Sequence, residues 1–178
     1  LHLRKGVKYS DGTPFTAEEY LYWWEHNANN PDLSPVAPEN WTFPLLDVTS
    51  EDKYSVTLHY GKPNPRVHLN DFQNNMGVAW GELPPADYMK QFHPDFVGKE
   101  KVMTMADTWF DFYSRIRDDS VVHPEYEYQR PVLRPYVVVE RSETTLLLER
   151  NPYYPFVDTS GNQLPYIDRI RVNLANNN

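Results

Sequence analysis

Hydrophobic and polar positions alternate in several parts of the chain with the period of two that a β-strand requires. The clearest example covers residues 54–60, where four apolar side chains alternate with polar ones: Tyr54, Val56, Leu58 and Tyr60. With a second strand near residues 46–49 and a turn at Glu51-Asp52, this segment predicts a hairpin. Two more strand-like runs surround residues 142–144, and a further alternation covers residues 167–175.

A helix is predicted over residues 17–29, because the residues before it carry signals that begin a helix. Thr16 is followed three residues later by Glu19, which is the spacing of a capping box, and Phe15 and Tyr20 occupy the positions of a hydrophobic staple. Four residues share one face of this helix, and we expect them to pack against a core: Ala17, Leu21, Trp24 and Ala28. Tyr20, Trp23 and Asn27 lie beside that face.

The remaining segments complete an α+β pattern. A short helix is expected after Asn64-Pro65, and a longer helical region covers about residues 99–118, with apolar residues at helical spacing: Val102, Met105, Trp109, Phe112 and Ile116. A turn is predicted at Asp11-Gly12. Proline-rich sequence makes residues 30–44 a long loop of the kind that often has a function. Polar, irregular sequence places a boundary within residues 119–130.

The composition limits the classes of partner and chemistry. Of the 178 residues, 40% are hydrophobic and 24% are charged, which is typical of a globular protein. The net charge of -8 disfavours nucleic acid and anionic membrane surfaces as partners, because both attract positively charged proteins. The lack of cysteine excludes disulfides and thiol chemistry, and no apolar run reaches the roughly 18 residues of a membrane span. Since both ends look like strand interior, we expect a fragment of a longer protein.

The sequence gives little evidence of a catalytic site. The six histidines have no compact ligand spacing, and the seven glycines form no phosphate-binding or dinucleotide-binding loop, so neither a metal nor a cofactor is expected. A glycoside hydrolase needs two carboxylates about 5–10 Å apart. Candidates are plentiful, namely Glu18-Glu19, Glu51-Asp52, Asp118-Asp119, Glu125 and Glu127. Each also fits a cap, a turn or a solvated surface, so a carboxylate-dependent hydrolase is kept only as an alternative to a protein that is not an enzyme.

Aromatic residues in loops are the more conspicuous feature. They are accompanied by asparagines, and together they suit a wet cleft that stacks on a neutral polar ligand and forms hydrogen bonds with it. The candidate ligand-binding residues are Asn40, Trp41, Asn75 and Trp80. The same aromatics suit packing between two lobes equally well. A purely structural or interaction domain is a third option, because unpaired strand ends near Leu1 and Leu174 would recruit partners.

Three stretches resemble the family 5 extracellular solute-binding proteins, the oligopeptide- and dipeptide-binding components of ABC transporters. The first is LHLRKGVKYSDGTPFTAEEYLYWWEH, which is similar to the strand, turn and helix signature of that family. The second is RPYVVVERSETTLLLERNPYY, and the third is GNQLPYIDRIRV. ADYMKQFHPDF resembles a helix of the larger members. The chain departs from the family pattern at Arg134, where glycine is usual, and at Pro155, where tryptophan is usual.

The resemblance implies a fragment of a periplasmic-binding-protein type II-like fold. Residues 1–130 would form most of a smaller α+β subdomain, and residues 131–178 would return into the sheet of the main lobe. The implied function is solute capture for an ABC transporter by closure of two lobes around a ligand. A peptide is the favoured ligand and an oligosaccharide the alternative, with a membrane permease and the remainder of the chain as partners. The implied location is periplasmic or extracellular, with the full-length protein anchored to the membrane as a lipoprotein.

Overall fold

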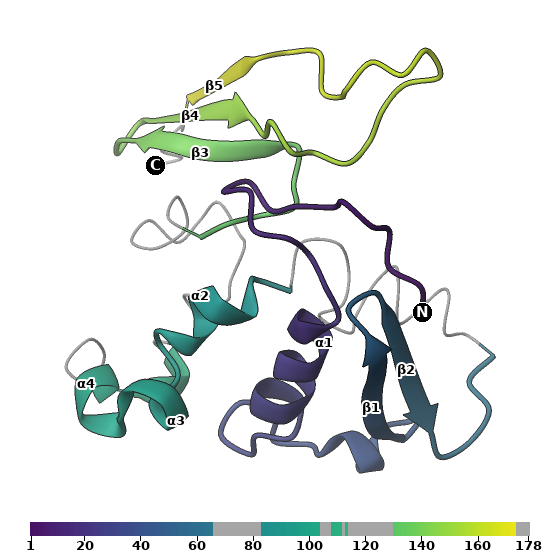
Figure 1. Cartoon of the computed structure of the whole chain (residues 1–178). Coiled ribbons are helices and arrows are strands. Elements are labelled where there is room, and N and C mark those ends of the chain that lie inside the picture. Colours follow the sequence, from purple (N-terminus) through teal and green to yellow (C-terminus); the bar gives the residue numbers. More distant parts are fainter. Residues whose placement is uncertain (66–82, 104–107, 112, 114–129, 174–178) are drawn as a thin grey trace.

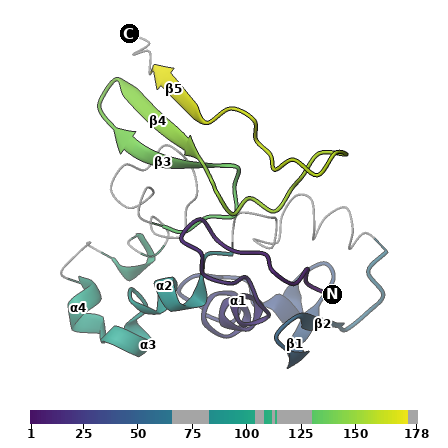
Figure 2. The ribbon, with the colours of Figure 1, turned by 45° about the horizontal axis from the view of Figure 1, so that its top comes forward.

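The computed structural model describes residues 1–65, 83–103, 108–111, 113 and 130–173 (Figure 1). Over these residues the chain has an α+β architecture with two separate antiparallel sheets. A hairpin is formed by β1 (Leu45–Asp52) and β2 (Ser55–Tyr60). A three-stranded sheet has the order β3 (Tyr136–Arg141), β4 (Thr145–Arg150), β5 (Arg169–Asn173). In Figures 1 and 2 the N-terminal segment runs between this sheet and the hairpin with its helices.

The first helix begins with the capping interactions that the sequence predicted. It consists of α1 (Glu18–Tyr22), which continues into the π-helical segment η1 (Trp23–Ala28). Glu19 Oε2 accepts the backbone N–H of Thr16 at 2.8 Å, and Thr16 Oγ1 accepts the N–H of Glu18 at 3.2 Å. The rings of Phe15 and Tyr20 meet edge to face with centroids 6.0 Å apart. The capping box and the staple are therefore confirmed.

The predicted core-facing side of this helix is confirmed. Ala17 and Ala28 are buried, and the half-buried Leu21 and Trp24 pack against the same cluster. Tyr20, Trp23 and Asn27, which were predicted to lie beside that side, are buried as well. A π-helix bonds each residue to the one five positions away, so its turns hold more residues than α-helical turns. This wider turn begins at Trp23 and brings Trp23 and Asn27 into the buried side together with Ala28, whereas Tyr20 and Leu21 lie in the α-helical turn before it.

The hairpin is confirmed, but its turn lies two residues later than predicted. Asp52 pairs with Ser55, so the turn is formed by Lys53 and Tyr54. The side chain of Asp52 holds the turn, because it accepts the N–H of Tyr54 at 2.6 Å and the hydroxyl of Ser55 at 3.1 Å. Those side-chain bonds explain why an aspartate ends the first strand.

The expectation of an unpaired strand end at Leu1 is wrong. The N–H of Val56 donates to the carbonyl of Leu1 at 2.9 Å, and the amino group of Leu1 donates to the carbonyl of Val56 at 2.6 Å. The first residues therefore cover an edge of β2. Leu174, the other expected end, lies outside the described residues, as does the short helix expected after Pro65.

Three short helices follow the hairpin in the chain: α2 (Ala86–Lys90), α3 (Pro94–Val97) and α4 (Lys99–Met103). The helix expected from the resemblance of residues 86–96 is thus present as α2 and α3. Helix α4 confirms the beginning of the long helical region predicted from residue 99, and much of the rest of that region is not described. No helix in the described ranges combines the length and the apolar character needed to cross a membrane.

Two apolar clusters hold the helical part together. The larger one joins the first helix, the hairpin and the N-terminal segment, and its most buried members are Tyr9, Ala17, Ala28, Leu45 and Val56. The smaller one joins the first helix to α2 and consists of Tyr22, Leu33, Ala86, Met89 and Tyr113. Helix α1 and its continuation therefore contribute to both clusters, with Tyr20 and Trp23 in one and Tyr22 in the other.

The three-stranded sheet is attached to the N-terminal segment by hydrogen bonds near its first strand. Ser10 donates its N–H to the carbonyl of Val132 at 2.9 Å and accepts the N–H of Val132 on Oγ at 3.1 Å. The buried side chain of Asn151 donates to the carbonyls of Val132 and Arg134. These bonds hold the backbone at Arg134, where the family pattern has glycine.

Candidate functional site

Asn40 and Trp41, two of the four predicted ligand-binding residues, lie together at the end of the 3-10 helix η2 (Pro38–Asn40). Asn40 is exposed, and Trp41 is half-buried with its ring centroid 6.4 Å from that of Trp23. The indole N–H of Trp41 donates to the carbonyl of Val36 at 3.0 Å. The other two predicted residues, Asn75 and Trp80, lie outside the described residues.

Only some groups of Asn40 and Trp41 are available for contact with a ligand. The Trp41 side chain packs against the larger cluster, while its indole nitrogen is occupied by Val36. The exposed part of the ring can therefore stack on a ligand, but the N–H has no free donor role. The amide of Asn40 is exposed beside it and can donate and accept hydrogen bonds. Packing and ligand contact, which the sequence left as alternatives, are both compatible with this ring.

The described acidic pairs have structural roles. Glu19 is buried, and this burial raises its pKa although the bonds from Thr16 favour the ionised form. Glu18 forms an ion pair with Lys90 at 2.6 Å, which joins α1 to α2. The pKa of Asp52 is lowered, chiefly because the carboxylate accepts the N–H of Tyr54. The other acidic candidates, Asp118, Asp119, Glu125 and Glu127, lie outside the described residues.

A cavity of about 150 Å³ lies on the three-stranded sheet, lined by Glu140, Thr145, Leu146, Leu147 and Arg171. Pockets that enclose small molecules have volumes of about 300–1,000 Å³. This cavity is therefore too small to hold a peptide or an oligosaccharide by itself.

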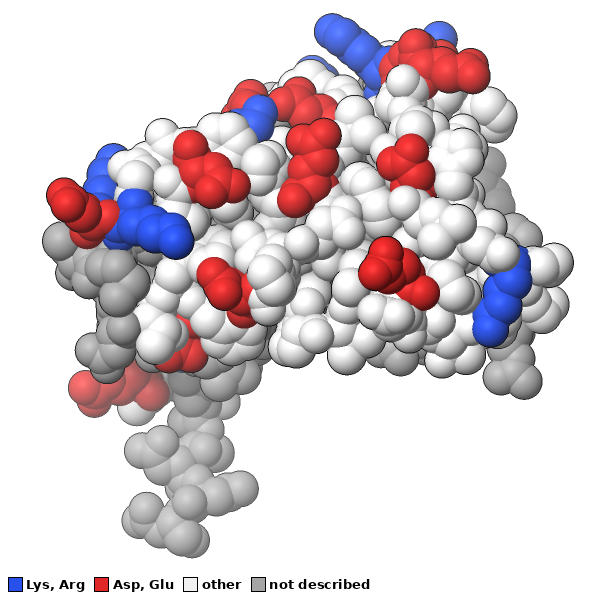
Figure 3. Space-filling model, turned by 90° about the horizontal axis from the view of Figure 1, so that it is seen from below, with Lys and Arg blue, Asp and Glu red and all other residues white. Residues whose placement is uncertain are grey.

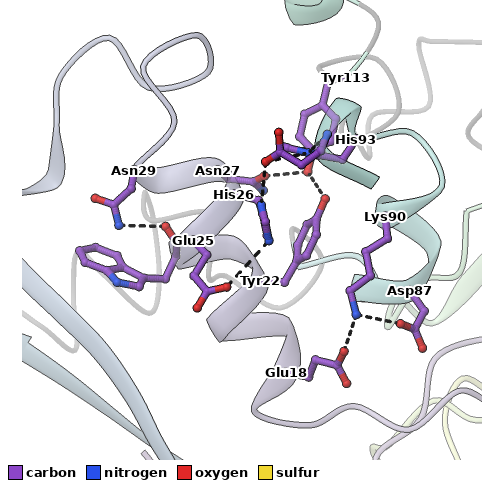
Figure 4. A network of polar contacts seen from close by, with 12 residues as sticks. Glu18, Tyr22, Glu25, His26, Asn27, Asn29, Asp87, Lys90, His93 and Tyr113 are labelled. Atoms are coloured by element: carbon purple, nitrogen blue, oxygen red, sulfur yellow. Dashed lines mark hydrogen bonds and ion pairs between the residues drawn. The ribbon is translucent and has the colours of Figure 1, made fainter. Parts of the chain in front are cut away.

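A network of polar side chains joins the first helix to α2 and α3 (Figure 4). The hydroxyl of Tyr113 donates to Asn27 Oδ1 at 2.6 Å and lies 3.0 Å from the hydroxyl of Tyr22. All three side chains are buried, and desolvation is the main reason that the pKa of Tyr22 is far above its ordinary value. Tyr22 therefore stays protonated, and the network links elements that are distant in the sequence.

The same network brings two histidines together, which the sequence analysis did not predict. His26 of η1 and His93, the residue that caps α3, have ring centroids 5.0 Å apart. Asp95 Oδ2 lies 3.4 Å from His26 Nδ1 and 3.6 Å from His93 Nδ1. The sequence His93-Pro94 contained one usable signal, because proline at the first helical position makes the preceding residue a cap. Nothing in the sequence indicated that His26 would meet it.

Comparison with known protein families matches residues 1–178 to the bacterial extracellular solute-binding proteins, family 5. The chain belongs to this family. It is 30% identical to the periplasmic alpha-galactoside-binding protein of Rhizobium meliloti (strain 1021) over 181 residues, which cover 98% of this chain and 23% of the relative.

Two solved structures support the fold. An oligopeptide-binding protein OppA is 34% identical, with a TM-score of 0.77, and the match covers 99% of this chain and 27% of that one. The periplasmic binding protein MelB of Agrobacterium fabrum C58, solved in complex with stachyose, is 27% identical, with a TM-score of 0.69 over 98% of this chain and 24% of that one. The predicted type II-like binding-protein fold is thereby confirmed. The chain spans about a quarter of the length of these relatives.

Proposed function

We propose that this chain is part of a solute-binding protein that captures a peptide and delivers it to the permease of an ABC transporter. The observation that carries the proposal is the family match over all 178 residues. The proposed mechanism is closure of two lobes around the ligand, which shifts the protein toward the closed state because the ligand contacts both lobes only there.

A peptide is favoured as the ligand by the likeness to a solved structure. The OppA structure, named as an oligopeptide-binding protein, has the higher identity and TM-score of the two structures compared above. The exposed amide of Asn40 beside the Trp41 ring supports this proposal, because peptides offer backbone hydrogen-bonding groups and side chains that stack on aromatic rings.

An oligosaccharide is the second candidate ligand, and two specific observations favour it. The Rhizobium meliloti relative is named as an alpha-galactoside-binding protein, and the MelB structure contains stachyose. Sugar rings stack on aromatic side chains and form hydrogen bonds with amides, so the Asn40 and Trp41 surface suits this ligand class as well.

Native purification followed by mass spectrometry tests the two ligand classes. The complete protein that contains this chain is purified without denaturation, and the small molecules released on unfolding are identified. A bound peptide supports the first proposal, and a bound galactoside or related oligosaccharide supports the second. Calorimetric titration with a peptide library and with stachyose provides the independent measurement. Failure to bind either class in both experiments would contradict the proposed function.

We predict that replacing Trp41 by alanine in the complete protein weakens ligand binding by about 1 kcal/mol or more, because an aromatic stacking contact contributes about that much. Isothermal titration calorimetry with the identified ligand measures the change. Tyr54→Ala, at the turn of the hairpin, is the matched control for loss of a half-buried aromatic ring. Unchanged affinity in a folded Trp41→Ala variant would remove Trp41 from the site.

The domain assignment is also part of the proposal. Residues 1–130 would form a smaller subdomain, and residues 131–178 would belong to the main lobe. Large apolar side chains are exposed between β4 and β5, including Val157 at 51%, Tyr166 at 65% and Ile167 at 60%. Such exposure suits a surface that packs against further protein. We assign that covering role to the remainder of the same polypeptide.

Two consequences follow for the isolated chain and for its location. The 178-residue chain alone should bind its ligand weakly or not at all, because one wall of the cleft would be missing. Micromolar binding by the isolated chain would contradict this. We propose that the complete protein works in the periplasm or outside the cell, held at the membrane by a lipid anchor; the proposal is supported by relatives that are named as periplasmic binding proteins.

A further inference from the structure

We propose that His26, His93 and Asp95 form a binding site for a divalent transition metal ion, with zinc as the reference ion. In the described part of the chain, these residues are grouped so that one possible ligand atom from each lies within 4.8 Å of the others. Imidazole nitrogens with one carboxylate oxygen form a donor set that suits zinc, copper or nickel. The site is separate from the Asn40 and Trp41 surface and does not depend on the ligand captured there.

The distances match the spacing of ligands around a small tetrahedral ion. Metal–ligand bonds of about 2.1 Å in a tetrahedron place neighbouring ligand atoms about 3.4 Å apart. Asp95 Oδ2 is 3.4 Å from Nδ1 of His26 and 3.6 Å from Nδ1 of His93. Three ligands from the protein leave a fourth position for water. The three ligand atoms all lie within 4.8 Å of one another, so bringing the widest pair to the tetrahedral spacing would complete the site.

Neighbouring groups surround both imidazole rings. A carboxylate oxygen of Glu25 lies 3.8 Å from Nε2 of His26, on the opposite side of the ring from Asp95. Metal-binding histidines commonly donate their second N–H to a carboxylate, and Glu25, whose side chain is 69% exposed, would have to move closer to accept it. The His93 ring meets the rings of Trp109 and Tyr113 edge to face at 5.1 and 5.6 Å between centroids. Figure 4 shows His26 between Glu25 and His93.

The protonation of His93 also suits metal binding. Nδ1 of His93 accepts the backbone N–H of Asp95 at 3.2 Å, so this nitrogen carries no proton in that arrangement. A metal ion would take the lone pair in place of the amide, whose residue is exposed to water. The other nitrogen, Nε2, is buried and has no hydrogen-bond partner among the described residues. In this tautomer Nε2 carries the proton, and a metal ion at Nδ1 would leave that N–H unchanged.

An ion can enter this site from solvent. The side chain of His93 is fully buried, whereas those of His26 and Asp95 are 20% and 62% exposed. His93 is thus fixed in the interior, and His26 and Asp95 line the path from the site to solvent. His59, by contrast, is an exposed histidine on the hairpin surface, where its Nε2 lies 2.8 Å from Thr49 Oγ1.

Zinc titration of the untagged, chelator-treated chain tests the proposal. Calorimetry should show one zinc ion bound per chain, and cobalt in its place should give the visible absorption of a tetrahedral ion. His26→Ala and Asp95→Asn should each weaken zinc binding at least tenfold, while His59→Ala, which removes a surface histidine, should leave it unchanged.

Three outcomes would overturn the proposal: no saturable zinc binding, equal affinity in wild type and in both ligand variants, or an equal loss in His59→Ala. Circular dichroism establishes that each variant is folded before titration. His93→Ala is not used to test the site, because removing a fully buried ring would leave a cavity that can unfold the chain. His26 and Asp95 are partly exposed, so their variants keep the test decisive.

Discussion

Glu19 has two roles at the start of the first helix, and these roles have opposite effects on its charge. Its carboxylate accepts the N–H and the hydroxyl of Thr16, which favours the ionised form. Burial favours the neutral form and is the larger effect, so the pKa is raised. A carboxyl group whose pKa is raised by folding stabilises the protein below its unfolded pKa, and this stabilisation is lost as the pH rises through the folded pKa.

We therefore expect wild type to lose stability relative to Glu19→Gln as the pH rises above the ordinary glutamate pKa of about 4.3. Glutamine keeps an oxygen that can accept from Thr16 but does not ionise. Urea unfolding followed by tryptophan fluorescence at pH 4 to 7 measures the difference. Glu51→Gln, on the exposed hairpin, is the control for loss of one negative charge. A difference between wild type and Glu19→Gln that stays constant over this range would contradict the expectation.

The elements of the helical part are joined by the hydrogen bonds of Tyr113 as well as by apolar packing. Its hydroxyl reaches Asn27 in η1 and Tyr22 in α1. Removing a buried hydroxyl that satisfies another buried polar atom leaves that atom without a partner, at a cost of about 1–3 kcal/mol. The bond to Asn27 therefore contributes to the attachment of Tyr113 to the first helix.

Tyr113→Phe should lower the free energy of unfolding by about 1–3 kcal/mol, because Asn27 Oδ1 loses its donor inside the smaller cluster. Chemical denaturation of the chain measures this loss. Tyr54→Phe removes a hydroxyl from a half-exposed ring at the hairpin turn and should change stability by less than about 0.5 kcal/mol. Equal effects of the two substitutions would show that the buried network adds nothing to stability.

The elements that could be predicted from the sequence are those that depend on near neighbours. The capping box of Thr16 and Glu19, the turn at Asp11-Gly12 and the alternation in β2 involve residues a few positions apart, and all are present. The π-helical turns of η1 could not be predicted, because their wider geometry has no local sequence signature. The burial of Trp23 and Asn27, which the sequence placed beside the core-facing side, falls within these turns.

The two candidate sites also differ in whether their residues are neighbours in the sequence. Asn40 and Trp41 could be proposed because a loop aromatic beside an amide is visible in the sequence, and their role stays a prediction; the bond from Trp41 to Val36 was not visible there. The pair His26 and His93 depends on how η1 packs against α3, which joins segments far apart in the chain. Contacts of this kind are set by the whole fold, so local spacing rules could not reveal them.

Charge and apolar surface are distributed differently over the whole molecule. The face seen in Figure 3 carries acidic side chains across its middle and basic ones nearer its rim. This distribution agrees with the net charge of -8. The exposed apolar side chains are concentrated instead in the connection between β4 and β5. In Figures 1 and 2 this connection extends away from the helices.

The isolated chain should self-associate through that connection, since exposed apolar surface is buried when copies meet. The double substitution Val157→Ser and Ile167→Ser should shift the sedimentation profile toward the monomer at equal protein concentration. Leu46→Ser removes a residue of comparable exposure, 56%, from the hairpin and serves as the control. Identical sedimentation of wild type and the double variant would contradict the expectation, as would an equal shift caused by Leu46→Ser.

The two bonds between Ser10 and Val132 tie the N-terminal turn to the segment that leads into β3. Gly12 lies in that turn with a φ of +91°, a backbone angle that other residues adopt with difficulty. A Cβ at this position would also lie 3.4 Å from the hydroxyl oxygen of Tyr153, in the connection that follows β4. A larger residue at position 12 would therefore strain the turn and crowd its contact with this connection at the same time.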